Sequence, residues 1–66
     1  MKLHVDQKAD ALYLRLDDSK IIDSEEVSPG VVLDYDEQDR VVGVEFLNIS
    51  TRAPHLNPRA LEFVTV

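Results

Sequence analysis

The densest group of oxygen ligands in the sequence lies in residues 34–39, which contain Asp34, Asp36, Glu37 and Asp39. Ca²⁺ and Mg²⁺ prefer carboxylates at alternating positions, and calcium-binding loops use such a pattern. A calcium loop that starts at Asp34 needs a glycine at its sixth position and a glutamate, entering a helix, at its twelfth. The sequence has Asp39 at the sixth position, and Glu45 at the twelfth falls in a predicted strand. We therefore favour a solvated turn and keep a minimal metal-dependent enzyme that uses Asp34 to Asp39 as an alternative.

Other groups with catalytic chemistry are few. The chain has no cysteine, which excludes thiol catalysis, disulfides and thiolate metal sites. Its two histidines, His4 and His55, are far apart in the sequence, and neither has a further ligand at metal-binding spacing. The adjacent acids Glu25 and Glu26 would point to opposite faces of a strand, which argues against a shared acid–base site. We therefore predict that the protein is not an enzyme and binds no metal or cofactor.

The charge of the chain limits the classes of partner. Thirteen acids against seven lysines and arginines give a net charge of −6, and residues 1–39 alone carry −7, with eleven acids and four bases. Because phosphate groups bind through Lys and Arg, this balance argues against nucleic acid and against acidic membrane surfaces. No apolar run approaches the roughly 20 residues of a membrane-spanning helix, and Asp6 interrupts any apolar core of a signal peptide. We expect a cytoplasmic protein.

Hydrophobic side chains recur with a period of two, which is typical of half-buried strands. Residues 2–6 alternate in this way, and residues 11–16 repeat the pattern with leucine at positions 12, 14 and 16. The polar residues between these segments form a short loop, which predicts a first antiparallel hairpin. Residues 21–27 are predicted to form an edge strand, because charges on both of its faces discourage pairing with another sheet.

Turn signals then delimit a second hairpin. Pro29 and Gly30 predict a type II turn with a positive φ at Gly30. Residues 31–35 and 41–46 are predicted to pair, with Asp39 as a left-handed residue in the turn between them. The alternation fails after residue 46, since it would place Asn48 on the inner face. This failure predicts a bulge or a change of partner near Leu47 and Asn48.

The last residues combine signals for helix and for strand. Asn57 followed by Pro58 has the form of a helix cap and a first-turn proline, which predicts one helical turn over Pro58 to Ala60. The β-branched and aromatic residues that follow favour a strand over residues 61–65. A chain of 66 residues has room for one domain. The predicted fold is therefore a single, mainly β domain over residues 1–66, a small antiparallel sheet of five or six short strands built from successive hairpins, with at most one short helical turn near Pro58.

Three blocks of the sequence resemble a known family. They are residues 6–16 (DQKADALYLRL), 25–36 (EEVSPGVVLDYD) and 40–50 (RVVGVEFLNIS). In this order and spacing they are similar to the small prokaryotic family called domain of unknown function 2283. The resemblance implies a compact antiparallel sheet and an unassigned function. It also implies a neighbouring small toxin-like protein, and so an antitoxin or neutralising role. The chain departs from the family pattern at Asp39, where glycine or asparagine is more usual, and after Arg52.

One sheet face carries residue types that are common in protein interfaces. Tyr and Arg combine a large contact area with a directional polar group and are favoured at interface centres. The alternation sets Tyr13 and Arg15 opposite the leucines of their strand, and the same face is predicted to include Val32, Val41 and Leu47. Such a face would expose more apolar area than a monomer usually leaves in water. We therefore predict a non-catalytic interaction module. The acidic first half and the family resemblance together imply that it is antitoxin-like and directed at a small basic protein, and we keep a self-associating structural protein, a homodimer, as the alternative.

Overall fold

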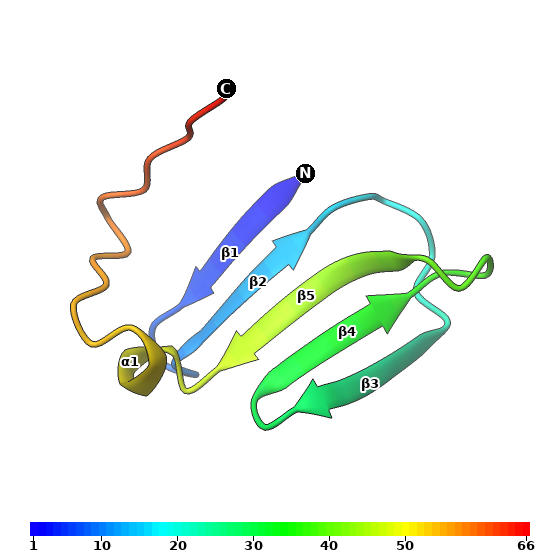
Figure 1. Cartoon of the computed structure of the whole chain (residues 1–66), viewed down its shortest axis with the longest axis horizontal. Helices are drawn as coiled ribbons and strands as arrows, with labels where there is room; N and C mark the ends of the chain where they lie inside the picture. Colours follow the sequence, from blue (N-terminus) through cyan, green and yellow to red (C-terminus); the bar gives the residue numbers. More distant parts are fainter.

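The computed structural model describes all 66 residues, as one open antiparallel sheet and one short helix (Figure 1). The strands are β1 (Lys2–Asp6), β2 (Ala11–Arg15), β3 (Asp23–Ser28), β4 (Val31–Tyr35) and β5 (Val41–Leu47), and the helix is α1 (Ile49–Arg52). The order across the sheet is β1-β2-β5-β4-β3, so β1 and β3 are its edges. The predicted mainly β fold is confirmed, with five strands. The four-residue helix is far too short to cross a membrane.

Strand β5 lies in the centre of the sheet and joins its two halves. The β1–β2 hairpin forms one half, and β3, β4 and β5 form a meander in the other. The halves meet where β2 pairs with β5, in a register that sets Leu14 opposite Val44. On the other side of β5, Val44 lies opposite Leu33 of β4. Both predicted hairpins are therefore present, and the β2–β5 pairing combines them into one sheet.

The pairings sort the side chains onto two unlike faces, because residues directly opposite each other on neighbouring strands point to the same side. We call one the leucine face; it holds Leu3, Val5, Leu12, Leu14, Val31, Leu33, Tyr35, Val44 and Phe46. We call the other the tyrosine face; it holds His4, Tyr13, Arg15, Ser24, Val32, Asp34, Gly43, Glu45 and Leu47. One face is thus almost wholly apolar, and the other is mixed and mainly polar.

A bulge interrupts β5 close to its start. Gly43 pairs with Asp34, but the next pair joins Val41 to Tyr35, so Val42 is an extra residue in the ladder. In a bulge of this kind two residues oppose one, and both take the side of that one residue. Val41 and Val42 therefore lie with Tyr35 on the leucine face. The bulge also packs Val42 well, since this side chain is only 3% exposed.

The irregularity predicted near Leu47 and Asn48 takes a different form. Strand β5 ends at Leu47, and Asn48, with a φ of 54°, turns the chain out of the sheet and into α1. The second bulge is in β3, where Val27 is the extra residue between two paired neighbours. The sequence pattern therefore located the end of β5 but neither of the two bulges.

Helix α1 begins where it does because a residue distant in the sequence caps it. The Asp10 carboxylate, in the β1–β2 turn, accepts a hydrogen bond from the backbone N–H of Ser50 (3.0 Å) and another from the Ser50 hydroxyl (2.7 Å). The Asp10 carbonyl accepts a third from the N–H of Ile49 (3.0 Å). These bonds satisfy N–H groups that a helix start leaves without partners. A contact across 40 residues thus fixes the helix.

The helical turn predicted at Pro58 and the strand predicted over residues 61–65 are both wrong. Asn57 does accept a hydrogen bond from the N–H of Arg59 (3.0 Å), but the chain makes a single turn there and no helix. Residues 61–66 have no regular structure and make no backbone hydrogen bond. Strand propensity alone could not order them, because a strand also needs a partner for its backbone groups.

Two turn residues have the backbone conformation that the sequence predicted. Gly30 has a φ of 75° and Asp39 a φ of 61°. A Cβ at Gly30 would lie 2.9 Å from a terminal nitrogen of the Arg52 guanidinium, so a larger residue there would displace that side chain. That guanidinium donates to the carbonyls of Pro29 and Leu47, and so ties α1 to the β3–β4 turn.

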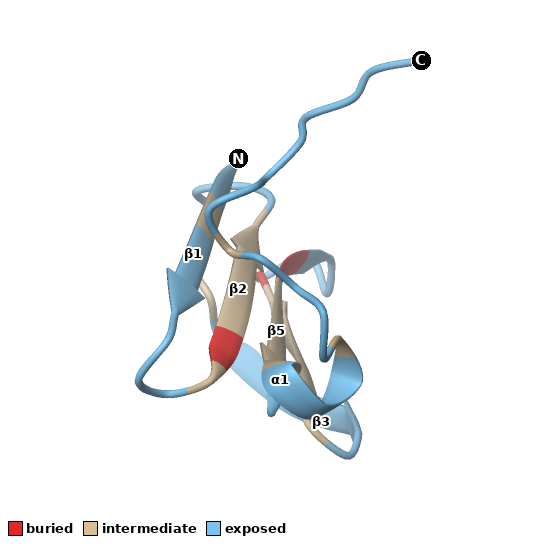
Figure 2. Cartoon of the chain, turned by 90° about the vertical axis from the view of Figure 1, so that its left-hand side faces the viewer, coloured by how far each residue is buried: buried red, intermediate tan, exposed pale blue.

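Very little of the molecule is buried (Figure 2). The buried residues are Ala11, Asp36, Val42 and Gly43. Most leucine-face side chains are only half-buried, because no second sheet or long helix is stacked on that face. Folded domains usually bury an apolar sheet face against a second layer. The leucine face lacks such a layer over most of its area.

Candidate functional site

A chain of side chains crosses the tyrosine face at its centre. The Tyr13 hydroxyl on β2 donates a hydrogen bond to Oδ2 of Asp34 on β4 (2.7 Å). Strand β5 lies between these two strands, and the tyrosine ring passes over Gly43 of β5. A Cβ on Gly43 would lie 2.4 Å from the Tyr13 oxygen and 3.0 Å from Asp34 Oδ2. The missing side chain of Gly43 therefore makes the bond possible.

The same chain extends to both edges of the sheet. At the β3 edge, the Ser24 hydroxyl donates to Oδ1 of Asp34 (2.5 Å). At the β1 edge, the His4 ring lies beside Tyr13, with 6.1 Å between the ring centroids and a tilt of 38°. The tyrosine face thus carries one connected group of side chains with a member or a close approach on every strand.

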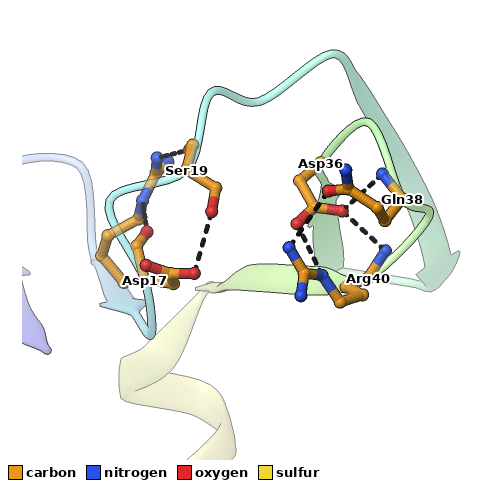
Figure 3. A network of polar contacts seen from close by, with 6 residues as sticks. Asp17, Ser19, Asp36, Gln38 and Arg40 are labelled. Atoms are coloured by element: carbon orange, nitrogen blue, oxygen red, sulfur yellow. Dashed lines mark hydrogen bonds and ion pairs between the residues drawn. The ribbon is translucent and has the colours of Figure 1, made fainter.

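Arg15 connects this group of side chains to the loop between β2 and β3. Its guanidinium lies 3.5 Å from the Tyr13 oxygen and donates to the carbonyls of Asp17 and Ser19, at 2.5 Å for Asp17. The Ser19 hydroxyl in turn donates to the Asp17 carboxylate (2.8 Å), as Figure 3 shows. Arg15 therefore binds the loop between β2 and β3 and is not a free cation.

The chemistry of this group is that of a structural network. Burial raises the pKa of the Tyr13 hydroxyl; the neighbouring Asp34 carboxylate raises it further, and the hydrogen bond from Arg15 opposes both. A raised pKa keeps the hydroxyl neutral, in the form that donates to Asp34. The Ser24 hydroxyl donates to the other oxygen of the same carboxylate, so both Asp34 oxygens accept a hydrogen bond within the network. The network therefore joins β2, β4 and β3 across the tyrosine face.

The residues predicted to form an interaction face are divided between the two faces. Tyr13, Arg15, Val32 and Leu47 do share the tyrosine face. The fifth, Val41, lies on the leucine face, because the bulge at Val42 reverses its side. The surplus of apolar area is also on the leucine face and not, as the sequence suggested, on the face of Tyr13.

The acids of residues 34–39 do not form one cluster. Asp34 lies on the tyrosine face, as described above, and Asp36 is buried in the β4–β5 turn with 2% of its surface exposed. The Asp36 carboxylate accepts from the N–H groups of Gln38 (3.0 Å) and Arg40 (2.9 Å) and from the Arg40 guanidinium (2.9 Å) (Figure 3). These bonds, with the one from the Arg40 N–H first, lower the pKa of Asp36. No three His, Asp or Glu side chains in the chain are placed to hold a metal ion.

The leucine face has an acidic border along β3. Asp23 pairs with Tyr35, and Glu25 pairs with Leu33, so both acids belong to that face. Their charges, with that of Asp39, add to the desolvation that raises the pKa of Tyr35. Sequence analysis missed this border because it identified no face for residues 21–27. The alternation of Asp23 and Glu25 with Ser24 and Glu26 was the available signal.

The residues after α1 cover one corner of the leucine face. There, Leu56, Ala60 and Leu61 line a hollow of about 90 Å³ together with residues of β1 and β2, which are Leu3, Val5 and Leu12. The hollow does not reach the part of the face on β5, β4 and β3. That part carries Phe46, Val44 and Leu33 next to the acidic border.

Two of the three arginines in the second half of the chain, Arg40 and Arg52, have separate partners. Arg40 precedes β5 and pairs with Asp36, whereas Arg52 follows β5 and binds backbone carbonyls. The seven residues of β5 separate Arg40 from Arg52, so these two residues lie beyond opposite ends of that strand. Arg59 lines another hollow with His4, Lys8 and Asp6.

A comparison with protein-family models found one match, to the family described as "Protein of unknown function (DUF2283)", over residues 2–50. This range contains all five strands and the start of α1, and it ends before residues 56–62, which line the hollow from the C-terminal side. Comparisons with curated proteins and with solved structures found no match.

Proposed function

The chain belongs to the DUF2283 family, and we propose that it is a non-catalytic interaction module that binds a basic protein through its leucine face. The observation that carries this proposal is the combination of an apolar face without a covering layer and a border of acids beside it. Leu33, for example, is half-buried in the free chain and lies directly opposite Glu25. A partner that covers the apolar centre and also carries Lys or Arg would satisfy both parts of this surface.

The energetic argument favours a partner over an isolated chain. Burial of apolar surface stabilises by about 25 cal/mol per Å², and a small chain without disulfides or metal has few other sources of stability. The free chain buries only Ala11 and Val42 among its hydrophobic residues. A partner that binds the folded form alone also stabilises the fold by mass action.

The charge of the chain argues for a basic partner. Its net charge is −6, and the negative charges of Glu25, Asp39 and Asp23 lie close enough to Tyr35 to help raise its pKa. Opposite charge accelerates encounter and disfavours wrong partners. The finer form of the proposal is an antitoxin-like role, in which the partner is a small basic toxin-like protein.

Adjacent residues of β3 provide a matched test. Glu25 and Glu26 are both exposed and equal in charge, but Glu25 pairs with Leu33 on the leucine face and Glu26 with Val32 on the tyrosine face. The tagged chain is used to capture partners from its native lysate, and the captured protein is then titrated against each variant. We expect a basic protein, bound at least tenfold more weakly by Glu25→Lys and within about twofold of wild type by Glu26→Lys, since charges near an interface act more strongly than remote ones.

Two outcomes would contradict the proposal. The first is capture of no protein other than the chain itself. The second is an equal loss of affinity in Glu25→Lys and Glu26→Lys, because that result would show a response to net charge and no role for the leucine face. Neither substitution touches a buried group, so circular dichroism should report the same fold for both variants.

A further inference from the structure

The segment Leu61–Val66 is a strand-forming sequence without a strand partner. Its side chains alternate as Leu, Glu, Phe, Val, Thr and Val, which are mostly β-branched or aromatic residues. Leu61 is 70% exposed, Phe63 79% and Val64 70%, and no backbone hydrogen bond involves this segment. Figure 2 shows it leading away from the sheet. Four large apolar side chains, and the backbone N–H and C=O groups of all six residues, are thus left in water.

The edge strand β1 lacks a strand partner on its outer side. It pairs with β2 on one side only, so its other side presents free backbone donors and acceptors. Edge strands are usually protected by bulges, proline or inward charges. Strand β1 pairs with β2 in an unbroken register and contains neither a bulge nor a proline.

The other edge is protected against the same segment. Strand β3 is interrupted by its bulge at Val27 and carries Asp23, Glu25 and Glu26, all exposed. Those acids would repel Glu62, the only charged residue of the segment. Strand β1 carries Lys2 and His4 on the tyrosine face, with a single acid, Asp6, at its end.

We propose that Leu61–Val66 adds as a sixth strand to the β1 edge of a second copy of this chain, and that the exchange is reciprocal and gives a closed dimer. This inference is independent of the partner proposed above, because it uses the edge of the sheet and not the leucine face. Addition of an extended segment to an exposed sheet edge is a general mode of recognition, in which backbone bonds give affinity and alternating side chains give register. Reciprocal exchange closes the assembly and prevents open-ended filaments.

The alternation selects a register. An antiparallel pairing of Leu61 with Val5 and of Phe63 with Leu3 continues the leucine face onto the added strand. The same pairing sets Glu62 opposite His4 and diagonal to Lys2, within reach of both on the tyrosine face. Leu61 and Phe63 therefore meet apolar residues on the leucine face. On the tyrosine face Val64 falls opposite Lys2, and Glu62 is diagonal to Lys2 on one side and to Asp6 on the other.

The chain's own β1 is not paired with this segment. Residues 56–62 already cross the leucine face of β1 and β2, where Leu61 and Glu62 line the hollow with Leu3 and Val5. To lie beside the same β1 in the plane of the sheet, the segment would have to leave this position. Pairing with another molecule also requires Leu61 and Glu62 to leave this hollow, but in this structure residues 61–66 form no backbone hydrogen bond with their own β1, which leaves both the segment and the edge available to a second copy.

The first test is the molar mass of the full chain by light scattering over a range of concentrations. We expect a species of twice 7.5 kDa for wild type and at least a tenfold weaker dimer for Phe63→Asp. Phe63 is 79% exposed, so this change does not threaten the fold. The matched control is Ile22→Asp, at another large, exposed apolar residue (56%) outside both β1 and the segment, and it should dimerise like wild type.

The second test addresses the register. Lys2→Glu should weaken the dimer several-fold, and the pair Lys2→Glu with Glu62→Lys should recover most of the loss. Hydrogen exchange should show added protection of β1 amides and of residues 61–66 in the dimer. A wild-type chain that stays at 7.5 kDa, with or without protected β1 amides, would overturn the proposal. A dimer that Phe63→Asp leaves intact, or that Ile22→Asp weakens equally, would overturn it as well.

Discussion

The hydroxyl of Tyr13 and the carboxylate of Asp34 form a 2.7 Å hydrogen bond although β2 and β4 are not neighbours in the sheet. The bond spans β5 at Gly43, where no side chain is present. Through this bond, polar side chains of the tyrosine face bind one another within the chain. The apolar side chains of the leucine face have no covering layer over most of their area. Because of this contrast, we assign binding of the basic partner to the leucine face.

Gly43→Ala should destabilise the fold through Tyr13. The added methyl would lie 2.4 Å from the Tyr13 oxygen, so the ring must move and the bond to Asp34 is lost. We expect the free energy of unfolding to fall by about 2 kcal/mol, within the range for overpacking, as measured by urea denaturation. In a Tyr13→Ala background the same substitution should cost much less. Equal costs in both backgrounds would show that Gly43 is needed for another reason.

Tyr13→Phe removes the hydroxyl alone and leaves the ring over Gly43. We expect a loss of about 1 kcal/mol, since one oxygen of Asp34 loses its hydrogen-bond donor in a half-buried setting. The variant should also keep the far-ultraviolet circular dichroism of wild type. An unchanged midpoint of denaturation would mean that water replaces the hydroxyl without loss.

The same hydroxyl predicts a component of instability at high pH. The pKa of Tyr13 in the folded chain is raised above its ordinary value of 10.0. Its stabilising contribution is therefore fully present below pH 10.0 and is lost as the pH rises through the folded pKa. Wild type should lose stability more steeply than Tyr13→Phe in this range. Tyr35, whose pKa is also raised, is present in both chains and cancels from the comparison.

Asp36 predicts instability at low pH. Its pKa is lowered from an ordinary value of 3.8 by the bonds from Arg40 and Gln38. The stabilising contribution is therefore present above pH 3.8 and is lost as the pH falls through the folded pKa. Asp36→Asn should have a lower melting temperature than wild type at neutral pH and a flatter decline in acid. Parallel acid profiles for the two chains would contradict this role of Asp36.

Asp10 should control helix α1 at a distance. Asp10→Gly keeps the left-handed backbone, whose φ is 54°, and removes the carboxylate that binds Ser50. We expect a loss of about 1 kcal/mol, the usual value for a helix cap, and faster hydrogen exchange at the Ser50 amide. Asp10→Asn is the control, because asparagine tolerates the same backbone and still accepts a hydrogen bond. Equal behaviour of the two variants would rule out the cap.

Local pattern predicted the strands well because each one follows the period of two. Leu12 and Leu14 alternate with Tyr13 and Arg15, and this order alone fixes a strand with two unlike faces. Gly30 and Asp39 likewise revealed turns through their backbone preferences. These features depend on residues that are neighbours in the sequence.

Features that depend on distant pairs were not predictable in the same way. The register of β2 on β5 brings the Tyr13 ring over Gly43. No local sequence pattern encodes this register. The bulge at Val42 moved Val41 to the other face, since one extra residue reverses the alternation. The helical turn was predicted at Pro58 but the helix begins at Ile49. The prediction missed it because its cap, Asp10, comes from a distant part of the sequence.

The most direct measurement of the proposed binding face is the exposure of its methyl groups to a soluble paramagnetic agent in nuclear magnetic resonance. In a dilute solution of the chain, the agent should strongly broaden the methyl signals of Leu33 and Val44. It should not broaden those of Val42, which is 3% exposed. Addition of the captured basic protein should protect Leu33 and Val44. Protection of these methyls before any partner is added, at the molar mass of a single chain, would contradict an open leucine face; so would broadening that the partner leaves unchanged.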